Sequence, residues 1–67
     1  MSRLLSASEA AKLLGFRKEA LLKLLDSGEI PAVRQGNRWK IDEGQLQEWF
    51  TAKALREAKA RREISNG

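Results

Sequence analysis

The sequence predicts a small, mainly helical domain that also carries one β-hairpin. Ser6 precedes Glu9 by three residues, and Asp42 precedes Gln45 by three; this spacing is typical of the capping box that begins a helix. After Pro31 the apolar residues change from helical spacing to alternation, which is typical of a strand. The 67 residues suffice for one domain with a thin core.

Two short helices are expected over residues 7–14 and 18–27. Gly15 is placed to end the first in a left-handed conformation, and Phe16 should then be buried. Each helix has apolar residues on one face, namely Ala10, Leu13 and Leu14 in the first, and Leu21, Leu24 and Leu25 in the second. Their lengths and short connection are typical of a helix-turn-helix, although a plain helical hairpin has the same spacing.

The segment AVRQGNRWKI, residues 32–41, is expected to form the hairpin. A three-residue loop over residues 35–37 pairs Val33 with Trp39 and Arg34 with Arg38. Apolar side chains then point inward and both arginines point outward. A two-residue Gly-Asn turn would pair Arg34 with Trp39 and mix the two faces. Because a slip of one residue moves every side chain to the other face, we expect the first register, with Trp39 packed on the core.

The predicted register places two cations directly opposite each other, at Arg34 and Arg38. Like charges in such cross-strand positions are destabilising. A polyanion lying across the outer face would offset this repulsion, and a phosphate backbone is such a polyanion. The alternative is a solvated, charged edge that resists aggregation. The hairpin therefore favours a nucleic-acid contact, with the solvated edge left open.

A third helix is expected to begin after Asp42 and to turn Leu46, Trp49 and Phe50 inward. The last part of the chain differs in composition. Residues 51–67 hold five cations and two acids, a net charge of +3, whereas residues 1–50 hold eight cations and seven acids, a net +1. We therefore expect a domain over residues 1–50 and a basic tail over 51–67. That tail is helical or frayed, and it contacts phosphates, a protein partner or only solvent.

Composition excludes several classes of protein. The chain has no histidine, cysteine or tyrosine, so it lacks the commonest general base and metal ligand, and we expect no enzyme, no cofactor and no metal site. No apolar run approaches the roughly 18 residues that span a bilayer, and the N-terminus lacks a signal-peptide pattern. We expect a cytoplasmic, nucleoid-associated protein without a membrane partner. The net charge of +4 favours an anionic partner.

The stretches "SASEAAKLLGF", "LLDSGEIPAVR" and "GNRWKI" make residues 4–50 resemble the excisionase-family DNA-binding domain, a MerR-like winged helix-turn-helix with three helices and a two-stranded wing. The resemblance implies that residues 18–27 form the recognition helix in the major groove. It also implies that residues 34–40 form a wing on the backbone or in the minor groove. Two positions depart from the family pattern. Arg17 stands where a Ser or Thr cap is usual, and Leu22 stands where an aromatic is frequent.

Together these features predict a sequence-specific protein that binds double-stranded DNA, of the excisionase type or a small transcriptional regulator. A protein-interaction adaptor that uses the basic tail is the alternative, and an RNA-binding module is a weaker one. The tail is also a candidate for self-association on DNA or for binding a recombinase. The predicted DNA-contacting residues are Lys12, Arg17, Lys18, Glu19, Leu22, Lys23, Arg34, Asn37, Arg38 and Lys40.

Overall fold

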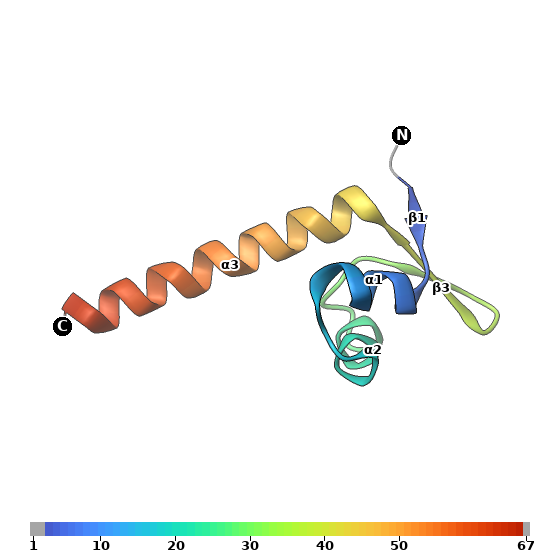
Figure 1. The fold of residues 1–67 in the computed structure, drawn as a ribbon, viewed down its shortest axis with the longest axis horizontal. Helices are drawn as coiled ribbons and strands as arrows, with labels where there is room; N and C mark the ends of the chain where they lie inside the picture. Colours follow the sequence, from blue (N-terminus) through green and yellow to red (C-terminus); the bar gives the residue numbers. More distant parts are fainter. Residues whose placement is uncertain (1–2, 67) are drawn as a thin grey trace.

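In the computed structural model, three helices pack with a three-stranded antiparallel sheet (Figure 1). The structure describes residues 3–66, with side chains through residue 63. The elements follow the order β1 (Leu4–Leu5), α1 (Ala7–Leu14), α2 (Lys18–Asp26), β2 (Val33–Gln35), β3 (Arg38–Asp42) and α3 (Glu43–Asn66). The predicted class, mainly helical with a small β component, is confirmed.

The sheet has one strand more than the two-stranded wing that was predicted. Strand β3 lies between β1 and β2. In β1, Leu4 pairs with Asp42 and Leu5 with Ile41. Two residues are too few to show a period of two, so β1 carries no sequence signal of its own. The same segment is tied to α3, because the Glu43 amide donates to the Arg3 carbonyl oxygen at 2.8 Å.

Helix α1 begins with the predicted capping box. The Ser6 hydroxyl accepts from the Glu9 amide at 3.1 Å, and the Glu9 carboxylate accepts from the Ser6 amide at 2.9 Å. Gly15 ends the helix with a φ of 71°. The predicted inward face is wrong in one residue, because Leu13 is 49% exposed. The buried stripe instead runs through the small residues Ala7, Ala10 and Ala11.

Helix α2 packs against α1 and supplies the largest buried side chains of the pair. Leu21 is fully buried and Leu25 nearly so, whereas Leu24 is half-buried. Arg17 is the N-cap and makes no side-chain capping bond. Phe16, between the helices, is half-buried and packs edge-on against Trp49 of α3, with ring centroids 6.4 Å apart. The turn between α1 and α2 therefore packs against α3 through this aromatic contact.

The predicted hairpin register is wrong. Val33 pairs with Lys40, Arg34 with Trp39 and Gln35 with Arg38, so the loop has two residues instead of three. Gly36 has a φ of 63°, and no other residue type has a positive φ in the described part of the chain. A positive φ at only the first central position is the pattern of a type II′ turn, whose twist suits a hairpin. The glycine at that position therefore favours the tighter loop.

This register puts Arg34 on the same face as Trp39 and leaves Val33 65% exposed. Trp39 is half-buried against the core, as expected. The Arg34 guanidinium carbon lies 5.5 Å from the indole centroid, so the charged group itself lies over the face of the ring in a cation–π contact, while the side chain remains 57% exposed to solvent. An arginine is therefore tolerated on the inner face. Arg34 and Arg38 do not oppose each other, and the like-charge argument for this hairpin does not hold.

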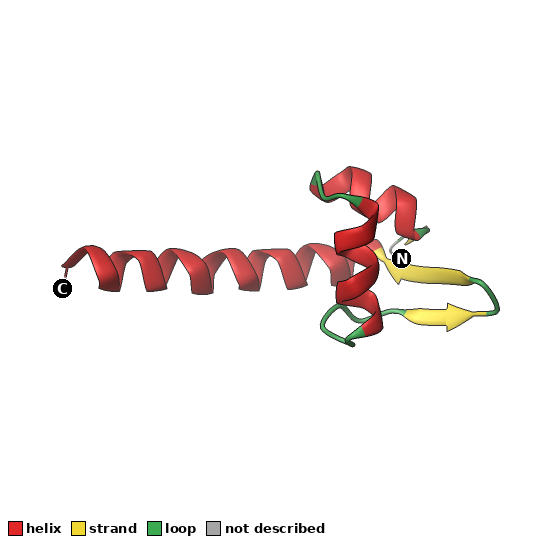
Figure 2. Ribbon diagram, turned by 90° about the horizontal axis from the view of Figure 1, so that it is seen from below, coloured by secondary structure: helices red, strands yellow, loops and turns green. Residues whose placement is uncertain are grey.

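Helix α3 begins beside the sheet and then leaves it. The Gln45 amide donates to the Asp42 carboxylate at 3.0 Å, so Asp42 caps the helix as predicted. Leu46 is fully buried, whereas Trp49 is half-buried and Phe50 is 41% exposed. The helix continues without interruption through Asn66, across the predicted boundary at residue 50. Its C-terminal half points away from the α1–α2 pair, on the side opposite to the hairpin turn (Figures 1 and 2).

The turn glycine provides a test of the register. Replacing Gly36 with alanine should lower the free energy of unfolding by about 1 kcal/mol, because a β-carbon is disfavoured at positive φ. A β-carbon there meets no atom within 4 Å, so the cost comes from the backbone alone. Urea unfolding followed by tryptophan fluorescence measures the change. Asn37→Ala, one residue later and without a positive φ, is the control; equal losses in both variants would contradict the turn geometry.

The α1 capping box predicts a dependence of stability on pH. Bonding to the Ser6 amide, then to the Ser6 hydroxyl and the Arg3 charge, lowers the pKa of Glu9 below its ordinary 4.5. A lowered folded-state pKa contributes stability above the ordinary value, and this contribution is lost as pH falls through the folded pKa. The melting-temperature advantage of the wild type over Glu9→Gln should therefore shrink between pH 7 and acidic pH. A difference that stays constant across that range would exclude this linkage.

Candidate nucleic-acid interface

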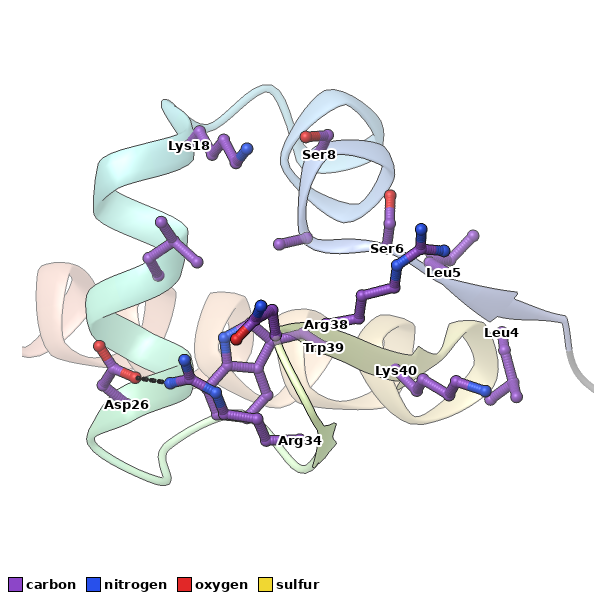
Figure 3. A pocket seen from close by; sticks show the side chains of 13 residues that line it. Leu4, Leu5, Ser6, Ser8, Lys18, Asp26, Arg34, Arg38, Trp39 and Lys40 are labelled. Carbon is purple, nitrogen blue, oxygen red and sulfur yellow. Dashed lines mark ion pairs between the residues drawn. The ribbon is translucent and has the colours of Figure 1, made fainter.

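A groove of about 760 Å³ lies between α2, the hairpin and the N-terminal end of α1 (Figure 3). We call it the α2–hairpin groove. It is lined by Leu4, Leu5, Ser6, Ala7, Ser8, Lys18, Leu22, Asp26, Arg34, Asn37, Arg38, Trp39 and Lys40. Side chains from three segments that are distant in sequence thus converge on one open surface.

One wall of the groove is formed by α2. Lys18, Leu22 and Asp26 are spaced four residues apart, so they lie above one another on one face of the helix. Glu19 and Lys23 follow two of these residues directly, and each is exposed. A helix turns by about 100° per residue, so Glu19 and Lys23 project further outward beside the groove. Leu22 is half-buried and packs against the core.

The hairpin forms the opposite wall, and one of its arginines spans the groove. An Arg34 Nη lies 3.9 Å from the Asp26 carboxylate of α2, and the Arg34 Nε donates to the Gly36 carbonyl oxygen at 3.5 Å. Arg38 and Lys40 are exposed, and their side chains extend from β3 toward Ser6 and Leu4 (Figure 3). Arg34 therefore faces α2, while Arg38 and Lys40 line the part of the groove next to β1 and the N-terminal end of α1.

A second, shallower hollow of about 340 Å³ lies beside the first, and Lys18 belongs to both. Lys12 of α1 lines this hollow together with Phe16 and Glu9. The two hollows form a continuous surface across α1, α2 and the hairpin. Five cations, Lys12, Lys18, Arg34, Arg38 and Lys40, outnumber the two acids Glu9 and Asp26, so this surface has a net charge of +3. An anionic, elongated ligand fits such a surface better than a small neutral one.

Residues 4–54 match the family model described as a helix-turn-helix domain. The chain belongs to this helix-turn-helix family. The match covers α1, α2, the hairpin and the packed first half of α3, and it supports double-stranded DNA as the partner. The comparisons with curated proteins and with solved structures give no match.

The predicted contact residues of this helix-turn-helix domain gather around the two hollows, with three exceptions. Those that line a hollow are Lys12, Lys18, Leu22, Arg34, Asn37, Arg38 and Lys40. Arg17, Glu19 and Lys23 line neither and are exposed on or next to α2. DNA contact by each of these residues stays a prediction. The structure corrects the direction of Arg34, which was expected to point outward with Arg38.

Sequence reasoning overlooked Asp26 as a residue of the site. It was seen only as one acid that balances the lysines of α2. Its spacing of four from Leu22 and of eight from Lys18 was the available signal, because this spacing places all three on one helix face. Its pairing with Arg34 joins two segments eight residues apart, and no local pattern predicts that contact.

Among the described residues, no three His, Cys, Asp or Glu side chains come together in a way that could hold a metal ion. Within the same part of the chain, no helix has the length and apolar character needed to cross a membrane.

Proposed function

We propose that this protein is a sequence-specific double-stranded DNA-binding protein that uses α2 in the major groove and the β2–β3 hairpin as a wing. The observation that carries the proposal is the α2–hairpin groove of a helix-turn-helix domain, which brings together Lys18, Arg34, Arg38 and Lys40. The major groove of DNA is wide enough to admit a helix, and a second helix in that position is the usual reading element of this motif.

Base contacts come from the outward residues of α2. Lys18 and Lys23 are exposed and suit the acceptor atoms of guanine, whereas Glu19 suits the amino group of cytosine. Leu22, half-buried at the edge of the groove, supplies apolar contact with a thymine methyl group. Lys12 of α1 and Arg17, the N-cap of α2, hold phosphates.

The wing contributes phosphate contacts. Arg38 and Lys40 alternate with Trp39 along β3, and both are exposed. Trp39 anchors the strand to the core from the opposite face. Contacts of this kind position a protein on the duplex without reading its sequence, and the wing therefore lies on the backbone or in the minor groove.

The protein acts in excision, in the manner of a recombination directionality factor, by occupying and bending its site. Regulation of transcription by the same contacts is the second assignment. In either role it recruits or excludes other proteins, catalyses no reaction and needs no cofactor. Its place of action is the DNA of the cytoplasm. The resemblance of its sequence to excisionase domains supports the first assignment.

Removal of one wing cation tests the interface. Arg38→Ala should weaken binding to a random-sequence duplex about three- to tenfold at low salt, and it should reduce the slope of log K against log salt by about 1. Fluorescence anisotropy across a salt series measures both quantities. Arg38 is exposed at the end of β3, so the melting temperature should hardly change.

Arg56→Ala is the matched control, because it removes the same charge from the projecting half of α3. Its effect on affinity should be smaller than that of Arg38→Ala. Equal losses would mean that the duplex responds to net charge or to the tail as strongly as to the wing, and they would contradict a special contribution of Arg38. No binding by the wild type at any salt would contradict DNA binding by the isolated chain.

The projecting half of α3 favours an additional role in assembly. Beyond residue 54 it extends away from the domain, and Leu55 is 66% exposed. Residues 51–67 also carry a net charge of +3. This segment joins neighbouring copies on DNA or binds a recombinase, which would make the protein partly an adaptor.

A chain ending at Ala54 separates this role from DNA binding, because it retains every residue of the family match. Its affinity for a short duplex should stay within about threefold of the full chain, since the groove is intact. Cooperative loading on a long duplex, measured as the steepness of the binding isotherm, should disappear. Unchanged cooperativity would exclude assembly through the tail. A large, salt-sensitive loss on the short duplex would instead indicate that the tail contacts phosphates.

A further inference from the structure

Asp26 is the one acidic residue that lines the α2–hairpin groove in the described part of the chain. The other charged residues there are Lys18, Arg34, Arg38 and Lys40. The side chains of Asp26 and Arg34 are 64% and 57% exposed, so a ligand entering the groove meets both. A negative charge at this point opposes the ligand that the rest of the surface attracts.

The requirements of the fold do not account for Asp26. It is the last residue of α2, and a carboxylate at the C-terminal end of a helix interacts unfavourably with the helix dipole. The ion pair with Arg34 is exposed and 3.9 Å long, and such pairs contribute little to stability. The position of the acid is better explained by what it does in the groove.

Asp26 is one of the groups that surround the Arg34 guanidinium. The Trp39 ring, the Gly36 carbonyl oxygen and the Asp26 carboxylate all lie close to it on the inner face of the hairpin. In this arrangement the guanidinium points toward α2 (Figure 3). To bind a phosphate, Arg34 has to give up the carboxylate, and the phosphate has to approach a fixed negative charge.

We propose that Asp26 is a specificity-determining residue, which weakens binding to DNA of any sequence by holding Arg34 and repelling phosphates at the groove. This inference rests on the proposed function. Both costs apply to every duplex alike, because every duplex presents phosphates. They are recovered only where a base edge offers the carboxylate a hydrogen-bond donor, as the amino group of cytosine does. Specificity is a difference of affinities, and lowering the general affinity increases it.

The test compares Asp26→Asn with Glu29→Gln. Both variants remove one negative charge, but Glu29 lies in the loop after α2 and outside the groove. Binding to a labelled random-sequence duplex is measured by fluorescence anisotropy at several salt concentrations. Asp26→Asn should bind about three- to fivefold more tightly than the wild type at low salt, and the gain should diminish as salt screens the charges. Glu29→Gln should gain distinctly less.

A second pair of variants tests the route through Arg34. The gain from Asp26→Asn should become smaller when it is introduced into an Arg34→Gln background, since the released arginine is then absent and only the relief of phosphate repulsion remains. A thermal melt of each variant checks that it is folded. Asp26→Asn should melt no lower than the wild type, because the asparagine removes the unfavourable interaction with the helix dipole.

Two results would overturn the inference while DNA binding itself stands. The first is an affinity of Asp26→Asn equal to that of the wild type or of Glu29→Gln. The second is a gain that persists in full without Arg34, which would remove the arginine from the account. If neither the wild type nor any variant binds the duplex at low salt, the proposed function fails.

Discussion

The structure depends on the burial of the central strand β3 at Ile41. This side chain is fully buried, and its strand pairs with β1 on one edge and with β2 on the other. Helix α1 packs against the same strand, and α3 starts where it ends. In a domain of this size the few large buried side chains carry most of the hydrophobic stabilisation. Strand β3 therefore fixes the position of the hairpin relative to α2, and in this way it maintains the shape of the groove.

The directions of the charged side chains determine the electrostatic character of the groove. The Arg34 guanidinium lies over the face of the Trp39 ring and its side chain remains 57% exposed, so a cation on the inner face costs the core little. Arg38 and Lys40 occupy the opposite side of β3, where they do not face Arg34. In the inference drawn above, Asp26 lowers the affinity of these cations for the phosphates of DNA.

The first turns of helix α3 pack on the domain, and the rest of the helix projects away from it. Leu46 and Trp49 pack on the domain, and the family match ends at residue 54. The remaining helix has few apolar side chains among many charges. Isolated helices of that length are marginal in water. Assembly with a partner or with DNA would add the contacts that this segment does not obtain from its own domain.

The sequence by itself determined the features that depend on neighbouring residues. The capping residues Ser6 and Asp42, the terminating Gly15 and the buried Leu21 were all predicted, because each signal acts within about one helical turn. Most of the cationic residues around the groove were also identified from sequence, since exposed charges near a helix pair suffice for that. The alternation after Pro31 correctly indicated a hairpin.

Only the tertiary structure decided what depends on segments that meet in space. Strand β1 is too short for a periodic signal and forms because β3 offers it a free edge. The hairpin register followed the turn geometry of Gly36 rather than the separation of apolar and charged residues, because the guanidinium of Arg34 can lie over the indole of Trp39. The Asp26–Arg34 contact across the groove also depends on two segments that meet in space. It exists because the core holds α2 and the hairpin side by side, and no local pattern contains that information.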